Sequence, residues 1–294
     1  MDIKTIGVIG AGSMGNGIAQ VCAANGFTVI MQDRADEYVQ RGLSTIRSSL
    51  GKFVEKGKLS AEDRDAIMGR LTATTNLADM KSADLVIEAV FEDFDVKKEV
   101  LMRLDEIVGA DCIIASNTSS ISITKLAAAT WKPERVIGMH FFNPVPLMQL
   151  VEIIRALQTS QETFEAIRDL SVQLGKTPVE VQDSPGFVAN RVLMPLLNEA
   201  MYTLQEGIAT ADAIDTVVRL GLNHPMGPLT LADYVGLDVC LDVLEVLLRD
   251  LGDPKYRPCP LLRKMVDAGY LGRKSGRGFY FWTGSQRGDM APVR

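Results

Sequence analysis

Short apolar runs alternate with longer amphipathic stretches through the first half of the chain. The runs at 6–9, 26–31, 84–90 and 112–116 have the length and composition of buried strands. The stretches at 16–25, 36–56, 62–69 and 96–108 carry apolar residues at helical spacing. Because strands that alternate with helices build a helix-covered parallel sheet, this pattern predicts a Rossmann-type α/β domain with a mostly parallel sheet.

Three more apolar segments close this half of the chain. They lie at 136–139, 147–154 and 177–182, and the first two are separated by a turn rich in proline. The sequence Asp-Ser-Pro-Gly at 183–186 then interrupts the alternation of strands and helices, as expected of a domain boundary. We therefore predict one domain over residues 1–184 and a second over 185–294.

The second half of the chain predicts a smaller, all-α domain. Helical patterns occupy 187–206, 210–220 and 229–251, and the last dozen residues resemble a loose tail. The first of these patterns is apolar on more than one face, which is typical of a buried helix. In so small a domain this indicates burial against a partner subunit, so we expect a homodimer. His224, between two of the helical patterns and among prolines and a glycine, is interpreted as structural.

A glycine-rich turn joins the first predicted strand to the first predicted helix. In the sequence GAGSMG, Gly10 permits the tight turn, Gly12 allows a close approach to a pyrophosphate, and Gly15 lets the helix pack on the sheet. Ser13 and Met14 lie between the second and third glycines, where the positive end of the helix faces the phosphates. The strand, turn and helix together predict a dinucleotide site.

Asp33 ends the second predicted strand, about 20 residues beyond the glycines. A carboxylate at this position binds both hydroxyls of an adenosine ribose and repels a 2′-phosphate, so NAD is favoured over NADP. Arg34 follows directly and offers a cation to a 2′-phosphate, which leaves NADP open.

Polar residues follow several of the predicted strands at their carboxyl ends. They are found at 89–92, at 117–119 and at His140. In an open α/β sheet these ends line the ligand crevice, which makes Ser119 a candidate site residue. The alternative for Ser119 is that it caps the helix predicted to begin near Ser122.

His140 and Glu152 lie in consecutive apolar segments. His140 directly follows the segment 136–139, and Glu152 lies within the segment 147–154. If the two strands are antiparallel and close, the carboxylate would orient the ring and stabilise the imidazolium, which is the arrangement of a proton-transfer dyad. The alternative is a hydrogen-bonded core histidine and a glutamate that pairs with a lysine or arginine. His140 follows a predicted strand at its carboxyl end, as the polar residues at 89–92 and 117–119 do, and this shared position favours the dyad.

Four basic residues lie on or just beyond the long helix at 36–56. They are Arg47, Lys52, Lys56 and Lys58. Such a run usually forms a solvent-exposed helix surface without a specific function. The alternative is that these residues bind an anionic part of the substrate.

Bulk properties narrow the class of protein. A chain of 294 residues with 47% hydrophobic and 23% charged residues is typical of an ordinary globular protein, and its net charge of −6 argues against nucleic acid as a partner. The four cysteines have no metal-ligand spacing, so no metal site is predicted. We expect a cytoplasmic protein, because we find neither a leader pattern nor a membrane-spanning run.

Several motifs, in one order along nearly the whole chain, carry a family resemblance. They are GAGSMGNGIAQ, SNTSS, HFFNPVPLMQLVEI, DSPGFVANR, NHPMGPLTLADYVGLD and GRKSGRGFY. The chain resembles the short-chain L-3-hydroxyacyl-CoA dehydrogenases, in particular the bacterial 3-hydroxybutyryl-CoA dehydrogenases. Ala189 departs from the pattern, since a larger aliphatic residue is common there.

The resemblance implies a role for each matched residue. His140 would be the general acid/base and Glu152 its orienting carboxylate, while Ser119 and Asn190 would hold the substrate at the reaction centre. The cofactor site would comprise Gly10, Gly12, Ser13, Met14, Gly15, Asp33, Glu92, Lys97 and Asn117. Ser49 and Lys56 would contact the coenzyme A portion of the substrate.

The implied reaction interconverts (S)-3-hydroxyacyl-CoA and 3-ketoacyl-CoA with NAD, and 3-hydroxybutyryl-CoA is the expected substrate. A dehydrogenase of a free hydroxy acid or sugar acid, of the L-gulonate 3-dehydrogenase or λ-crystallin type, is the nearer alternative. A non-enzymatic NAD-binding structural protein is the more distant one. The resemblance also implies a homodimer formed through the helical domain.

Overall fold

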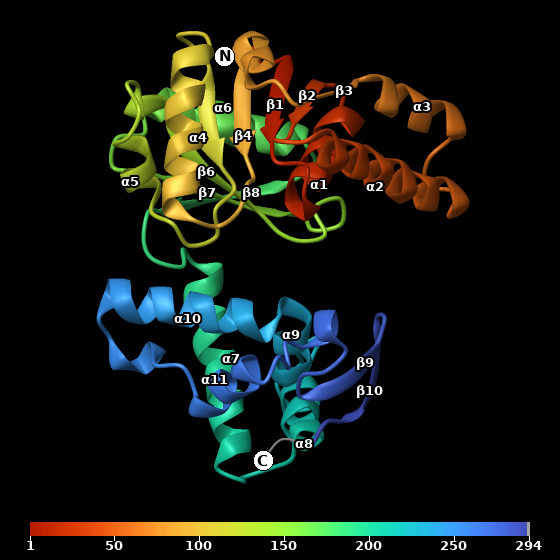
Figure 1. Cartoon of the computed structure of the whole chain (residues 1–294), viewed down its shortest axis with the longest axis vertical. Coiled ribbons are helices and arrows are strands. Elements are labelled where there is room, and N and C mark those ends of the chain that lie inside the picture. Colours follow the sequence, from red (N-terminus) through yellow and green to blue (C-terminus); the bar gives the residue numbers. More distant parts are fainter. Residues whose placement is uncertain (293–294) are drawn as a thin grey trace. The chain divides into compact units, whose positions relative to one another are not determined.

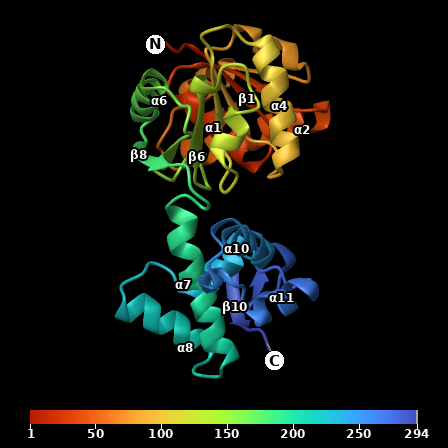
Figure 2. The same cartoon turned by 90° about the vertical axis from the view of Figure 1, so that its left-hand side faces the viewer.

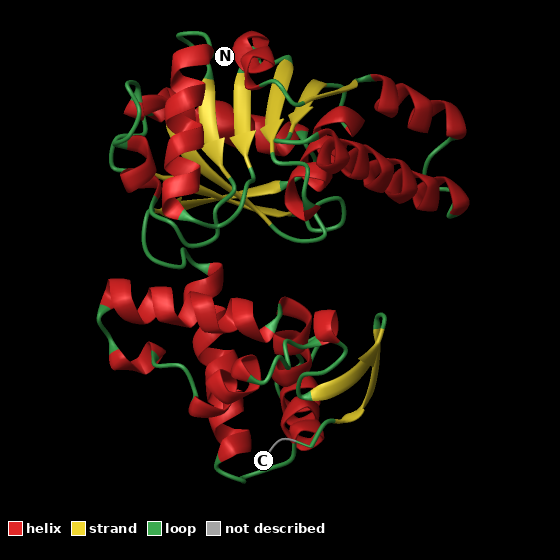
Figure 3. Cartoon of the chain, viewed as in Figure 1, coloured by secondary structure: helices red, strands yellow, loops and turns green. Residues whose placement is uncertain are grey.

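The computed structural model describes residues 1–292 and divides the chain into two compact units, Met1–Ser184 and Pro185–Arg294 (Figure 1). The first unit holds a large sheet with helices around it, and the second is built mainly of helices (Figure 3). The predicted fold class, a Rossmann-type sheet followed by a helical domain, is confirmed.

The sheet of the first unit has eight strands in the order β3-β2-β1-β4-β5-β6-β7-β8. All neighbouring pairs are parallel except β6 and β7, which are antiparallel. The strands are β1 (Thr5–Ile9), β2 (Thr28–Gln32), β3 (Leu71–Thr74), β4 (Leu85–Glu88), β5 (Ile113–Ser116), β6 (Val136–Phe141), β7 (Leu150–Arg155) and β8 (Thr177–Gln182). Only β3 was not predicted, because its side chains are at most half-buried and its sequence, Leu-Thr-Ala-Thr, has little apolar character.

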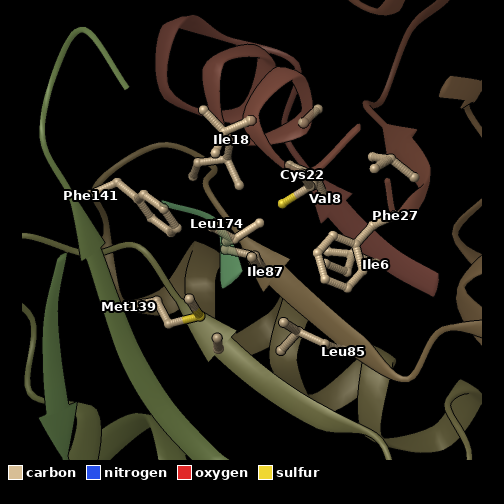
Figure 4. Packing of buried hydrophobic residues seen from close by; sticks show 14 of the residues in the cluster. Ile6, Val8, Ile18, Cys22, Phe27, Leu85, Ile87, Met139, Phe141 and Leu174 are labelled. Atoms are coloured by element: carbon tan, nitrogen blue, oxygen red, sulfur yellow. The ribbon is translucent and has the colours of Figure 1, made fainter. Parts of the chain in front are cut away.

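Helices connect these strands. They are α1 (Ser13–Ala24), α2 (Asp36–Glu55), α3 (Ala61–Gly69), α4 (Phe94–Ile107), α5 (Ile123–Ala127) and α6 (Gln161–Gln173), with a 3₁₀ helix at Leu77–Ser82 and another at Pro133–Arg135. Ile18 and Cys22 of α1 pack with Leu85, Ile87 and other strand residues in one large core cluster (Figure 4). This packing fixes the glycine-rich turn at the start of α1 against the sheet.

The second unit contains α7 (Ala189–Gln205), α8 (Ala211–Thr216), a π-helical turn (Val217–Gly221), α9 (Pro228–Val235), α10 (Leu237–Leu251) and α11 (Pro260–Asp267) (Figure 2). Two short 3₁₀ helices lie at Pro254–Tyr256 and Arg273–Ser275. Among the described residues, no helix has the length and apolar content needed to cross a membrane.

The structure corrects three expectations for this unit. The single helix predicted over 229–251 is two helices, because Gly236 has φ of +104° and breaks the helical path between α9 and α10. The helix predicted from residue 187 begins at Ala189, since Phe187 has φ of +50°. The expected loose tail instead includes β10 (Gln286–Met290), which pairs with β9 (Tyr280–Thr283) in an antiparallel hairpin.

Candidate functional site

The glycine-rich turn has a geometry that only glycine permits at two positions. Gly10 has φ of +97°, and a Cβ there would lie 2.6 Å from the Ala89 carbonyl oxygen. A Cβ on Gly15 would lie 1.7 Å from the Gly10 carbonyl oxygen, so α1 can approach the turn this closely only with glycine. A Cβ on Gly12 would meet nothing within 4 Å, so this backbone borders open space.

This open space suits a dinucleotide. The N-cap of α1 is Gly12, no side chain caps the helix, and the first turn, which includes Ser13 and Met14, has no acidic residue. The first N–H groups of α1, together with its positive dipole end, therefore fit a phosphate group. The residues present match the requirements of a bound NAD.

Asp33 is fixed beside this turn. Its Oδ2 accepts a hydrogen bond from the Ala11 N–H at 2.8 Å, and its Oδ1 accepts one from the Arg34 N–H at 2.7 Å. The carboxylate is thus held at the end of β2, next to the glycines, as the ribose-binding role requires. The Arg34 guanidinium lies over the Tyr38 ring, 5.3 Å from its centroid.

Glu92, in the loop after β4, accepts hydrogen bonds from polar groups that follow β5. Its Oε1 accepts hydrogen bonds from Thr118 Oγ1 at 2.6 Å and from the Ser119 N–H at 2.9 Å, and Ser119 Oγ lies 3.3 Å away. Burial would raise the pKa of Glu92, but Lys97 and the hydrogen bonds from Thr118 and Ser119 outweigh it, so the pKa lies below its usual value. Glu92 is therefore a carboxylate at neutral pH.

Lys97 anchors Glu92 from inside the protein. Its side chain is only 1% exposed, and its Nζ lies 2.7 Å from Glu88 Oε1 and 3.2 Å from Glu92 Oε2. Glu88 is fully buried, and its other oxygen accepts a hydrogen bond from Ser116 Oγ at 2.6 Å. A buried ammonium with two carboxylate partners fixes the loop after β4 to the end of β5.

His140 and Glu152 form a buried pair. The antiparallel register of β6 and β7 places the two residues directly opposite each other. His140 Nδ1 lies 2.8 Å from Glu152 Oε2, and both side chains are nearly inaccessible to solvent. Because an ionised carboxylate can only accept, Nδ1 donates the hydrogen bond, which fixes the tautomer of the ring. Phe142 lies against the imidazole, with ring centroids 4.5 Å apart.

Asn117 ties β5 to the end of β6. Its Oδ1 accepts a hydrogen bond from the Phe141 N–H at 2.9 Å, one residue beyond His140. Ser119 is not the cap of the next helix, because Ser122 Oγ accepts the capping bond from the Lys125 N–H at 3.2 Å. The alternative interpretation of Ser119 as an N-cap is therefore wrong.

Ser49 and Lys56 line one small cavity of about 190 Å³. Lys52 and Lys58 line it too, and Pro144 and Leu147, from the loop that follows β6, contribute to its walls. The basic C-terminal end of α2 thus lies beside the loop that follows β6, the strand that contains His140.

Asn190 belongs to the second unit, where it is the second residue of α7. Its role at the reaction centre stays a prediction. The structure brings together His140 with Glu152, and Glu92 with Lys97 and Ser119.

Two structural residues of the site were missed in the sequence. Glu88 was included in an apolar strand without a role, although a carboxylate embedded in a buried strand is the same signal that drew attention to Glu152. Asp183 was interpreted only as part of a boundary. Its carboxylate accepts hydrogen bonds from Ser122 Oγ and from the Thr124 N–H, at 2.7 and 2.8 Å, and so fixes the start of α5.

A mostly parallel sheet with a glycine-rich turn after its first strand, an aspartate after its second and polar groups at its strand ends is typical of a dinucleotide-binding domain. Comparison with known proteins gives the family. Residues 5–184 match the model of the 3-hydroxyacyl-CoA dehydrogenase NAD binding domain, and residues 186–282 match that of the 3-hydroxyacyl-CoA dehydrogenase C-terminal domain.

Relatives cover nearly the whole chain. A protein of Deinococcus radiodurans named "Probable 3-hydroxybutyryl-CoA dehydrogenase" is 56% identical over 93% of this chain and 98% of its own. The 3-hydroxybutyryl-CoA dehydrogenase of Bradyrhizobium diazoefficiens is 49% identical over 97% of each. The crystal structure of (S)-3-hydroxybutyryl-CoA dehydrogenase from Ralstonia eutropha is 55% identical, with a TM-score of 0.93 over 96% of this chain and all of that one.

The chain belongs to the 3-hydroxyacyl-CoA dehydrogenase family and is an NAD-dependent oxidoreductase. The family resemblance seen in the sequence and the expected cofactor are both confirmed.

Replacing Lys97 with methionine tests the buried network. The substitution leaves Glu88 and Glu92 without their cation, and loss of one partner from a buried ion pair is costly, so the free energy of unfolding should fall by about 3 kcal/mol. Chemical denaturation measures this value. Lys98→Met, at the next position of α4, is the control and should change it by less than about 0.5 kcal/mol. Equal effects of the two variants would show that the network contributes nothing.

Proposed function

We propose that this enzyme interconverts (S)-3-hydroxybutyryl-CoA and acetoacetyl-CoA. The buried His140–Glu152 pair, at the end of a strand beside a dinucleotide site, is the observation that carries the proposal. The choice of substrate is supported by relatives that are named for this activity and are 49–56% identical over nearly the whole chain.

The proposed proton transfer uses the second nitrogen of His140. In the oxidative direction, Nε2 accepts the proton of the 3-hydroxyl group, and the ring becomes an imidazolium that Glu152 stabilises across their 2.8 Å contact. When bound, NAD supplies the acceptor for the hydride that leaves C3. In the reductive direction, the imidazolium returns its proton to the 3-keto oxygen. Acid–base catalysis of this kind is typically worth about 10²- to 10⁴-fold.

The other matched residues position the reactants. We propose that Ser119 and Asn190 hold the substrate oxygen and reaction centre, and that Glu92, Lys97 and Asn117 line the nicotinamide side. The contact of Ser119 with the ionised Glu92 supports this assignment, because it fixes the hydroxyl at the strand ends. Gly10, Gly12, Ser13, Met14, Gly15 and Asp33 would hold the adenosine and pyrophosphate.

Absorbance at the NADH band tests the proposed reaction. NADH should be consumed rapidly with acetoacetyl-CoA and not with acetoacetate, because only the thioester carries the phosphate groups of coenzyme A that the lysines can bind. A parallel run with NADPH should be slow, since Asp33 repels a 2′-phosphate. Consumption with acetoacetate alone would overturn the proposal in favour of a hydroxy-acid dehydrogenase.

Ser49 and Lys56 are proposed to bind the coenzyme A portion. Lys56→Ala should raise KM for acetoacetyl-CoA about tenfold, because a charge-assisted contact of roughly 1.4 kcal/mol is lost, and should leave kcat within twofold. Steady-state kinetics measures both. Lys81→Ala, which removes an exposed lysine far along the sequence from the cavity, is the matched control and should change neither. An effect of Lys56→Ala on kcat alone would refute the anchoring role.

We further propose a homodimer formed through the second unit. Four apolar residues around α8 and the π-helical turn support this, because each is at least 60% exposed: Ile208, Val217, Leu220 and Leu222. Light scattering should give twice the chain mass of 32.1 kDa. A single-chain mass at micromolar concentration would contradict the dimer.

We place the enzyme in the cytoplasm. All four cysteines are buried and none forms a disulfide, which suits a reducing compartment. Fractionation of the source cells tests this location, and recovery outside the cytoplasm would contradict it.

A further inference from the structure

Glu88 is a carboxylate at the centre of the large sheet, and the proposed function gives it no role. It is the last residue of β4, and the register places it beside Ile9 of β1 on one side and Ser116 of β5 on the other. The glycine turn begins directly after Ile9, so Glu88 lies at the strand ends that border the dinucleotide site. Its exposed fraction is 0%. A carboxylate is buried so completely only where specific partners compensate its charge.

Three donors hold Glu88 in its anionic form. Its Oε1 accepts hydrogen bonds from the Val90 N–H and from Lys97 Nζ, each at 2.7 Å. Its Oε2 accepts one from Ser116 Oγ at 2.6 Å, and Ser116 Oγ in turn accepts one from the Thr118 N–H at 3.3 Å. Because both oxygens of Glu88 accept and neither donates, the group is an ionised carboxylate.

Glu88, Lys97 and Glu92 form a charged cluster with one cation and two anions, which leaves a net charge of −1. Lys97 Nζ makes its shorter contact, 2.7 Å, with the fully buried Glu88, and its longer contact, 3.2 Å, with Glu92. The Glu92 side chain is 38% exposed, whereas those of Lys97 and Glu88 are at most 1% exposed. The excess negative charge therefore lies on Glu92, the member of the cluster that reaches the surface.

A negative charge at this place distinguishes the two redox forms of the cofactor. The nicotinamide ring is positively charged in NAD⁺ and neutral in NADH, while the rest of the molecule is the same. A carboxylate beside the ring attracts the charged form by a Coulomb interaction that the neutral form lacks. This difference would vanish if Lys97 neutralised Glu92. Glu88 prevents that, because it compensates the Lys97 charge inside the protein.

We propose that Glu88 is a positioning residue that sets the preference of the site for NAD⁺ over NADH. Glu88 holds and neutralises Lys97, so that the Glu92 carboxylate keeps its negative charge beside the nicotinamide. The inference rests on the proposed place of Glu92 at the nicotinamide side. It adds a buried residue, which touches neither cofactor nor substrate, to those on which cofactor binding depends.

The first test removes the charge of Glu88 and keeps its shape. In Glu88→Gln, Lys97 pairs with Glu92 alone and the cluster becomes neutral. Calorimetry with each cofactor, in the absence of any acyl substrate, should show that the Kd of NAD⁺ rises about tenfold and that of NADH changes less than twofold. A purely structural role would weaken the binding of both forms alike, so equal changes in the two Kd values would overturn the proposal.

Ser116→Ala is the matched control for the hydrogen bonds of the network. It removes one donor from the same buried carboxylate but changes no charge. The ratio of the two Kd values should therefore stay within twofold of the parent's. A shift of this ratio as large as that in Glu88→Gln would show that the geometry of the network, and not its charge, sets the preference, and the proposal would fail.

The second test restores the charge of the cluster without Glu88. The double variant Glu88→Gln/Lys97→Met again has a net charge of −1, carried by Glu92. The ratio of the two Kd values should return to within about threefold of the parent's. Because this variant leaves no unpaired charge in the core, it decides the matter even if Glu88→Gln alone does not fold. A tenfold departure of its ratio from that of the parent would overturn the proposal.

These outcomes separate the role of Glu88 from the reaction itself, because cofactor binding requires no thioester. If the parent enzyme does not oxidise NADH with acetoacetyl-CoA, the proposed function fails, whatever the Kd values are. If it does so, but Glu88→Gln weakens the binding of NAD⁺ and NADH alike, only the role of Glu88 fails.

Discussion

The antiparallel pairing of β6 with β7 is the constraint on which the site depends. In this register His140 faces Glu152, and a slip of one residue would turn the carboxylate to the opposite face of the sheet. Packing holds the register close by: a Cβ on Gly138 would lie 2.8 Å from the Cβ of its partner Ile154. The bond from the Phe141 N–H to Asn117 fixes the end of β6 from the other side.

The direction of the parallel strands brings the remaining groups to one edge. The glycine turn follows β1, Asp33 follows β2, Glu92 follows β4, and Ser119 follows β5, so all lie beyond carboxyl ends of the same sheet. Such positions would be mobile loops without anchors. The buried contact of Lys97 with Glu88 and Glu92 supplies one anchor, and a buried charge is retained only where partners compensate it.

Much of this arrangement could be predicted from the sequence, because it depends on local patterns. The strand, glycine turn and helix at 6–25 form one contiguous signal, and the prediction that His140 faces Glu152 needed only two strands and a short turn. Glu88 could not be assigned a partner, because Lys97 reaches it through tertiary packing. The break at Gly236 was missed because apolar spacing does not show where a backbone leaves the helical region. The hairpin at 280–290 was missed because β10 is exposed along its whole length and its sequence, Gln-Arg-Gly-Asp-Met, has no apolar alternation. A second cavity, which also borders Lys58, depends on four segments distant in sequence.

The central claim is that His140 and Glu152 act as one proton-transferring unit. The most direct measurement is a double-mutant cycle on kcat with His140→Gln, Glu152→Gln and the double variant, together with the Kd of NADH for each. The account predicts that the double variant loses no more activity than His140→Gln alone, by about 10²- to 10⁴-fold, with the Kd of NADH within a few-fold of the parent. Losses that simply multiply would contradict the account, because they would show that the two residues act independently.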